Sequence, residues 1–122
     1  MNKKRVDSLI PEAYKKLEIT GIVEGGKIKN TWRGQISSFG AAVATGSLLA
    51  AVSFFNAQGN SDVPRQKLME AIFSLIGSVS GCSSLFEYVV KCKKDGRERS
   101  AKEEIINGAI ALKLAMNLYE RV

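Results

Sequence analysis

The chain has 122 residues, with 18 Lys or Arg against 12 Asp or Glu, a formal net charge of +6 and no histidine. This length fits a single domain over residues 1–122, and an apolar fraction of 45% is that of a globular protein with one core. The missing histidine excludes Ser–His and Cys–His nucleophilic pairs and imidazole metal ligands. The positive charge favours polyanionic partners such as nucleic acid.

Apolar residues recur at helical spacing almost throughout, and no run of strand length alternates with period two. The sequence therefore predicts an all-α fold, a compact bundle of about five to six helices. A first helix is expected over residues 3–23, ended by Gly25 and Gly26. A second is expected over 29–44, and a third from the N-cap Ser47 to about Asn56.

The second half of the chain contains three further helical patterns. Asp62 as N-cap and Pro64 in the first turn predict a helix that runs to about Val79. A fifth helix follows the SGCSS segment at residues 80–84 and is expected to end at Asp95 and Gly96. Ser100 and Glu103 are spaced as a capping box, which predicts the start of a last helix that runs nearly to the C-terminus.

The central segment 36–55 carries no charge and is about long enough to cross a bilayer. Its serines, threonine and glycines weaken transfer into hydrocarbon, although such residues do occur in packed membrane helices. Small residues also allow two helices to approach closely inside a water-soluble bundle. We expect two buried helices joined near Gly46, with a single membrane span as the alternative.

No constellation of reactive residues suggests catalysis. Asp7, Asp62 and Asp95 each fall at an expected helix end, where capping is the ordinary role. Glu103 and Glu104 are adjacent and point about 100° apart on a helix, so they do not converge on one substrate. We therefore expect no enzyme, no metal and no cofactor.

Two cysteines, Cys82 and Cys92, are too few for a disulfide framework or a structural zinc site. The N-terminal residues are basic but lack the apolar core of a signal peptide. These features predict a cytoplasmic protein.

Basic residues gather in three places: around Trp32, at Arg65 and Lys67, and in the segment 91–102. Cations beside an aromatic ring are the parts of a sequence-tolerant single-strand site, although a tryptophan on an apolar helix face is more often core. The candidate nucleic-acid contacts are Lys27, Lys29, Arg33, Lys91, Lys93, Lys94, Arg97 and Arg99.

The stretch ISSFGAAVATGSLLAAVSFF, at residues 36–55, resembles a motif of the small α-helical subunit of type III-B (Cmr-type) CRISPR RNA-guided effectors. The motif reads Ser-Phe-Gly at Ser38–Gly40, continues with Gly46, Leu48 and Leu49, and ends as Ala-x-x-Phe with Ala51, Phe54 and Phe55. Chain length, the LMEAI segment and a long final helix also agree. Members of that family tend to carry Trp-Leu-Lys near the C-terminus, where this chain has Ala111–Lys113.

The resemblance implies a noncatalytic subunit of a ribonucleoprotein complex involved in antiviral defence. Several copies would stack along the complex interior, beside a backbone subunit and a large polymerase-like subunit, with their basic face toward guide and target RNA. Alternatives are the related type III-A small subunit and a helical protein-interaction module whose lysines serve only solubility.

Overall fold

The computed structural model describes residues 1–57, 62–76 and 81–122. This part of the chain contains six α-helices and a small sheet of three two-residue strands, so the all-α prediction is confirmed. In chain order the elements are α1 (Lys3–Ile19), β1 (Val23–Glu24), β2 (Lys27–Ile28), α2 (Asn30–Thr45), α3 (Leu48–Asn56), α4 (Gln66–Leu75), α5 (Leu85–Lys94), α6 (Glu98–Met116) and β3 (Glu120–Arg121).

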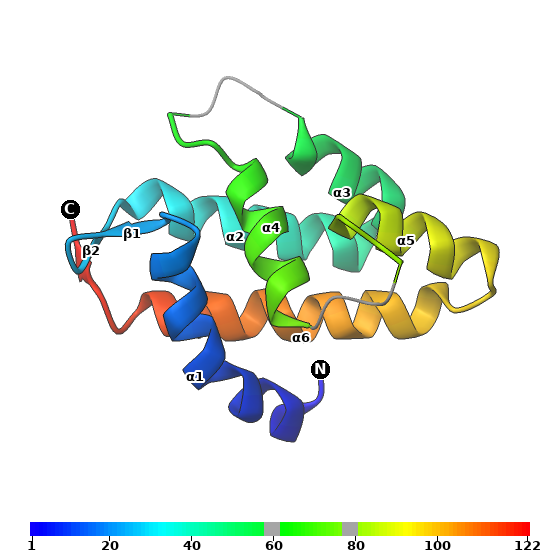
Figure 1. The fold of residues 1–122 in the computed structure, drawn as a ribbon, viewed down its shortest axis with the longest axis horizontal. Helices are drawn as coiled ribbons and strands as arrows, with labels where there is room; N and C mark the ends of the chain where they lie inside the picture. Colours follow the sequence, from blue (N-terminus) through cyan, green and yellow to red (C-terminus); the bar gives the residue numbers. More distant parts are fainter. Residues whose placement is uncertain (58–61, 77–80) are drawn as a thin grey trace.

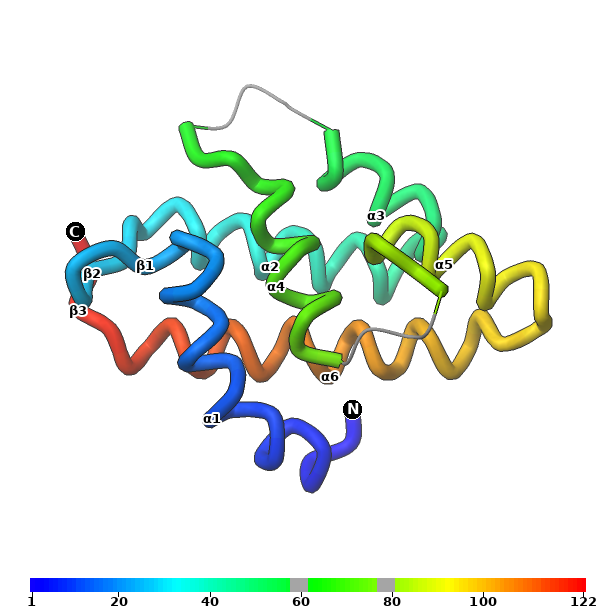
Figure 2. Tube along the Cα trace, viewed as in Figure 1, coloured from blue at the N-terminus to red at the C-terminus, as the bar shows by residue number. Residues whose placement is uncertain are grey.

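Helices α2 and α6 lie side by side along the longest axis of the molecule and run in opposite directions (Figure 1). Helix α1 crosses α6 near its C-terminal end, and α4 packs against both α1 and α6. The β1–β2 hairpin lies at one end of the α2–α6 pair, and the turn between α5 and α6 lies at the other (Figure 2). The two ends are therefore about the length of α6 apart, roughly 28 Å for 19 helical residues.

The uncharged segment 36–55 is two helices, as the sequence predicts. Helix α2 ends at Gly46, and the Ser47 hydroxyl accepts the backbone N–H of Ala50 at 3.3 Å to cap α3. The rings of Phe39 and Phe55 then meet edge to face, 5.3 Å between centroids, and both are buried. Aromatic packing of this kind closes the α2–α3 corner.

Among the described residues, no helix combines the length and the apolar composition that a bilayer crossing requires.

The end of the first helix differs from the prediction of 3–23. Helix α1 ends at Ile19, Gly21 has a left-handed φ of 80°, and the chain enters the β1–β2 hairpin. Gly25 and Gly26, expected to end the helix, instead form the hairpin turn with positive φ. Strand β3 pairs in parallel with β2. Two-residue strands are too short to show a period of two, so the sequence pattern did not reveal them.

The fourth helix was predicted to start at Asp62, but α4 begins at Gln66, and Asp62 does not cap it. The predicted helix end at Val79 lies outside the described residues. Helix α5 ends at Asp95 and Gly96, as predicted, with Gly96 at a φ of 75°.

The predicted capping box at Ser100 and Glu103 is wrong, because α6 already begins at Glu98 and both residues lie inside it. A serine–glutamate pair of this kind instead starts α5. The Ser84 hydroxyl accepts the Glu87 backbone N–H at 3.1 Å, and the Glu87 carboxylate accepts the Ser83 backbone N–H at 2.7 Å. Of the aspartates expected at helix ends, Asp95 is the C-cap of α5, whereas Asp7 lies inside α1.

Polar contacts fix α1 to α6. The Arg5 guanidinium donates two hydrogen bonds to the Glu104 carboxylate, at 3.0 and 2.9 Å, and this partner raises the pKa of Arg5. The buried Asn107 side chain accepts the Asn2 backbone N–H at 3.0 Å. These contacts set the crossing of α1 over α6, which in turn fixes where the hairpin lies.

Candidate functional site

The predicted cationic residues form two separate groups, one at each end of the α2–α6 pair. Lys27 is on β2 and Lys29 is the N-cap of α2, at the hairpin end. The residues from Lys91 to Arg99 form the last turn of α5, the connecting turn and the start of α6, at the opposite end. The predicted residues therefore do not make one continuous patch in the fold.

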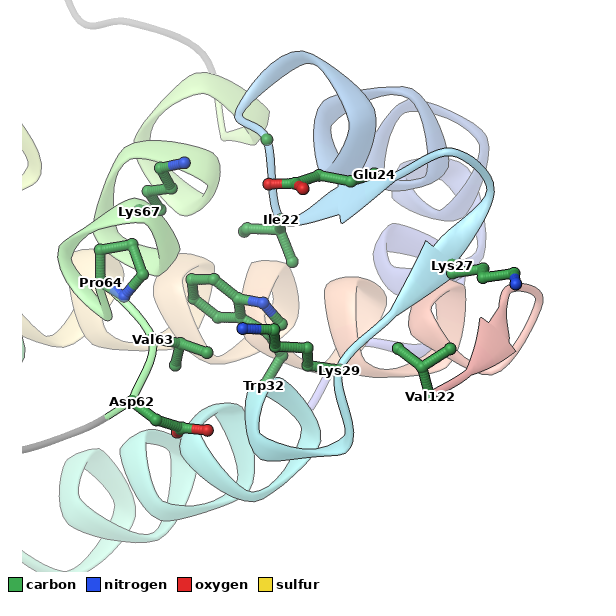
Figure 3. A pocket seen from close by; sticks show the side chains of 11 residues that line it. Ile22, Glu24, Lys27, Lys29, Trp32, Asp62, Val63, Pro64, Lys67 and Val122 are labelled. Atoms are coloured by element: carbon green, nitrogen blue, oxygen red, sulfur yellow. The ribbon is translucent and has the colours of Figure 1, made fainter.

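The first group borders a concave site, here called the hairpin pocket, with a volume of about 330 Å³. Figure 3 shows the indole of Trp32 at its centre, with Lys67 and Pro64 on one side and Lys29 on the other. Side chains of both charge signs line it: Lys27, Lys29, Lys67, Glu24 and Asp62. The pocket is thus formed by the hairpin, the first turn of α2 and the start of α4.

Trp32 is part of the core and part of this pocket. It is only 4% exposed, so its face is not available to stack a base, in agreement with the core role that its apolar helix position favours. Its indole N–H makes no hydrogen bond within the described ranges, and the nitrogen atom remains partly accessible to solvent. The pocket floor therefore presents one unused hydrogen-bond donor.

The Lys67 Nζ lies close to Gly21 at the edge of the pocket. A Cβ built on Gly21 would lie 2.9 Å from the Lys67 Nζ, which is closer than non-bonded atoms approach. The left-handed φ of 80° at Gly21 also favours glycine there.

The second group borders a shallower site, here called the corner hollow, with a volume of about 310 Å³. It lies between the α2–α3 turn at Gly46–Leu48 and the first turns of α6. Three cations line it, Lys93, Arg99 and Lys102, against one carboxylate, that of Glu98. An excess of cations around a polar backbone turn suits a phosphate group.

The other predicted residues of the segment lie outside the corner hollow. Lys91 and Lys94 are exposed in the last turn of α5, where positive charge also stabilises the helix C-terminus. Arg97 pairs with Asp95 at 3.3 Å, and both side chains are about half exposed. An exposed pair of this kind contributes little to stability, so Arg97 can exchange its partner for a phosphate.

Two arginines near the hairpin pocket do not line it. Arg33 does not line the pocket, and its half-buried side chain points its Nε into the protein. The Arg65 guanidinium donates to the Phe54 carbonyl at 3.0 Å and lies over the Phe54 ring at 4.3 Å. Arg65 therefore joins α3 to the start of α4 instead of facing a ligand.

The sequence places Lys67 in a basic group but not among the candidate nucleic-acid contacts, and it does not single out Lys102. Lys67 lies 38 positions beyond Lys29, and Lys102 lies 55 positions beyond Ser47. No sequence spacing joins such positions. Only the packing of α4 beside the hairpin, and of α6 beside the α2–α3 turn, brings them together.

Each end also carries a tyrosine with a perturbed pKa. Burial, followed by the neighbouring Cys92, raises the pKa of Tyr88 on α5 to about 12. Near the hairpin end, burial and a hydrogen bond to the Tyr14 carbonyl at 2.9 Å raise the pKa of Tyr119. Both phenols stay neutral near pH 7, so neither supplies a base or nucleophile.

In the described part of the chain, no three His, Cys, Asp or Glu side chains lie together as a metal site would require. Cys82 and Cys92 are both free thiols, and Cys92 is buried. The arrangement around both concave sites can hold and neutralise an anionic group through lysine and arginine donors.

An apolar groove separates the two cationic ends. It lies between α2 and α6 and is about 290 Å³ in volume, with Ile36, Ala41, Ile106 and Ile110 among its lining residues. Small side chains on α2 leave this space open. The groove offers apolar contact to another surface but no charged group except Lys113.

Comparisons of the chain with models of protein families, with curated proteins and with solved structures found no match.

Proposed function

We propose that the protein is a noncatalytic, RNA-facing small subunit of a type III-B CRISPR ribonucleoprotein effector. Its cations would hold phosphates without reading base sequence, while cleavage belongs to other subunits. Its partners would be further copies of itself, a backbone subunit, a large polymerase-like subunit, and guide and target RNA. The site of action would be the cytoplasm.

The observation that carries this proposal is the corner hollow, where Lys93, Arg99 and Lys102 converge against the single carboxylate of Glu98. Lysine and arginine donors at such a site neutralise phosphate and release counterions from the nucleic acid. The net charge of +6 has the sign that nucleic-acid binding requires. Lys27, Lys29 and Lys67 at the opposite end offer a second contact to the same strand.

The motif behind the resemblance also has a structural role here. Phe39 and Phe55, which belong to the two halves of the motif, meet across the Gly46–Ser47 break. The motif thus builds the α2–α3 corner that forms one wall of the corner hollow. This supports the family proposal through packing, and it makes no use of a catalytic group.

The test is a triple variant that removes the corner charges, Lys93→Gln, Arg99→Gln and Lys102→Gln. Binding of a labelled single-stranded RNA is measured by anisotropy at several salt concentrations. Each lost phosphate contact lowers the salt slope by about 0.7 on single strands, so the slope should fall by about 2. The control replaces Lys3, Lys4 and Lys15 on α1 by Gln, which changes the net charge equally.

Equal effects of the two triple variants would show that only overall charge matters and would contradict a site at the corner. A second measurement uses the assembled ribonucleoprotein. Neutralising the whole run Lys91, Lys93, Lys94, Arg97 and Arg99 should reduce crosslinking of this subunit to RNA. Unchanged crosslinking would remove the segment from the RNA path.

The apolar groove between α2 and α6 favours the second candidate, a protein-interaction module without RNA contact. Such a module would join its partners through Ile106 and Ile110 and give no crosslink to RNA. Replacing Ala41 by Glu at the groove mouth would then abolish co-purification with the partners. In the RNA-facing proposal, the same change leaves RNA binding by the isolated chain intact.

A further inference from the structure

We infer that the hairpin pocket receives one nucleotide of single-stranded RNA, with the base inside the pocket and the phosphate at its lysine rim. The inference rests on the proposed RNA-facing function, since the RNA strand supplies the nucleotide. It goes further by assigning a base-contacting pocket to a protein otherwise proposed to touch only phosphate.

The first argument is the unused donor in the pocket floor. Trp32 is 96% buried, and no acceptor in the described ranges takes its indole N–H. Because this donor faces the pocket, it can be hydrated in the free protein, and an acceptor on a ligand would take the place of that water. The carbonyl oxygens and ring nitrogens of nucleobases are acceptors of the required kind.

The second argument is the mixture of charges around that floor. Glu24 and Asp62 add carboxylate acceptors to the same pocket, on either side of the indole in Figure 3. Asp62 already accepts the Thr31 hydroxyl at 3.2 Å, which uses one of its lone pairs and orients its side chain. The pocket thus offers both a donor and acceptors, the pattern with which proteins bind the edge of an unstacked base.

The third argument is the positive charge at the rim of the hairpin pocket. Lys29 and Lys67 come from two different elements and carry ammonium groups beside the indole, whereas the Lys27 ammonium points away from it in Figure 3. The Lys67 Nζ lies close to Gly21, 2.9 Å from where a Cβ would stand. The rim charges fit the phosphate that follows or precedes a bound base.

Two simpler occupants fit less well. Inorganic phosphate would use the lysines but would meet the carboxylates of Glu24 and Asp62. An apolar side chain of a partner would leave three ammonium groups and the indole N–H unpaired. A volume of about 330 Å³ is at the lower end for small-molecule sites, which suits a single nucleotide.

The test uses the full chain, whose sequence contains one tryptophan, so indole fluorescence reports on this pocket alone. Uridine 5′-monophosphate and adenosine 5′-monophosphate are titrated separately, with inorganic phosphate as the comparison. We expect saturable change of the emission with at least one nucleotide and none with phosphate. Lys67→Met should weaken that binding about tenfold, and the control Lys4→Met on α1 should not change it.

The second variant is Trp32→Phe, which keeps an aromatic ring in the core and removes the donor. Calorimetric titration with the same nucleotide should show binding at least about fivefold weaker, with circular dichroism confirming the fold. Unchanged affinity in Trp32→Phe and in Lys67→Met overturns the inference, as does an equal response to inorganic phosphate.

A parallel titration with a labelled oligouridylate separates this inference from the proposed function. RNA binding without any change of Trp32 emission overturns the pocket and leaves the RNA-facing role. Nucleotide binding that depends on Lys67, together with no binding of RNA, supports a nucleotide pocket but contradicts the RNA-facing role and an RNA strand as the occupant. Absence of both contradicts both proposals.

Discussion

The hairpin pocket and the corner hollow each gather three cations at one end of the α2–α6 pair, but the surfaces beneath the cations differ. The hairpin pocket has a buried aromatic floor with a free N–H and two carboxylates among its lysines. The corner hollow has a polar backbone turn and one carboxylate among its cations. With three cations each, the hairpin pocket has a formal side-chain charge of +1 and the corner hollow one of +2. The comparison teaches that similar groups of cations can border different surfaces, for which we propose different roles: contact with a base at the hairpin pocket and with phosphate at the corner hollow.

The largest expected effect is on stability. It tests whether Trp32, which forms the floor of the hairpin pocket, is also part of the hydrophobic core. Trp32→Ala should lower the free energy of unfolding by about 3–5 kcal/mol, because it removes a buried ring and leaves a cavity. Urea denaturation measures the change. The control is Phe54→Ala, where the ring is 60% exposed and the loss should stay near 1 kcal/mol. Equal losses would mean that Trp32 is not a core residue.

The second expected effect concerns RNA length. The two ends lie roughly 28 Å apart along α6, which a stacked strand spans in about eight nucleotides at about 3.4 Å each. Oligonucleotides that reach both ends should bind about a hundredfold more tightly than shorter ones, through the second contact. Anisotropy over a length series measures this. The same rise in the corner triple variant would show that the two ends do not act on one strand.

A smaller effect is expected from the cap of α5, the helix that carries Lys91, Lys93 and Lys94. Ser84→Ala removes the hydroxyl that accepts the Glu87 backbone N–H, so the free energy of unfolding should fall by about 1 kcal/mol. Thermal unfolding measures it. Ser74→Ala, on the exposed face of α4, serves as the control and should be neutral. If Ser84→Ala leaves the free energy of unfolding unchanged, packing alone holds the N-terminal end of α5.

The last effect appears only in alkaline solution. The folded protein keeps the Tyr88 proton up to about pH 12, whereas the unfolded chain releases it near the ordinary pKa of 10.0. The folded state therefore binds more protons in this interval, and stability falls as the pH rises from about 10 to about 12. In Tyr88→Phe this part of the fall should be missing, as chemical denaturation at successive pH values would show. Superimposable curves for the two proteins would contradict the raised pKa.

Regular spacing of apolar residues predicted much of the helical core. The spacing of four, three and four residues predicts that Trp32, Ile36, Phe39 and Val43 share one helix face, and all four are buried on α2. Helical spacing would also add Ile19 to the apolar stripe of the first helix, but Ile19 is 73% exposed, since the helix ends there and the chain turns into the hairpin. Periodicity is reliable within a helix and loses meaning at its last turn.

The sequence predicts a helix cap correctly where the cap depends only on residues of the same turn. Ser47 accepts the N–H of Ala50 as expected, because the hydroxyl and the amide lie three residues apart on the same turn. Asp62 fails as a cap and contacts Thr31 instead, since residues 62–65 pack beside α2 before α4 begins. A competing tertiary contact decided the start of that helix.

By itself, the sequence determined that the chain folds as helices, that the uncharged centre breaks at Gly46, and that cations gather in particular segments. Helix formation and charge are properties of neighbouring residues, which the sequence lists directly. Only the tertiary structure decided that Lys67 joins Lys29 beside Trp32, and that Lys102 joins Lys93 and Arg99. Whether those side chains lie close together depends on how α4 and α6 pack, and this packing is set by contacts between residues far apart in the chain.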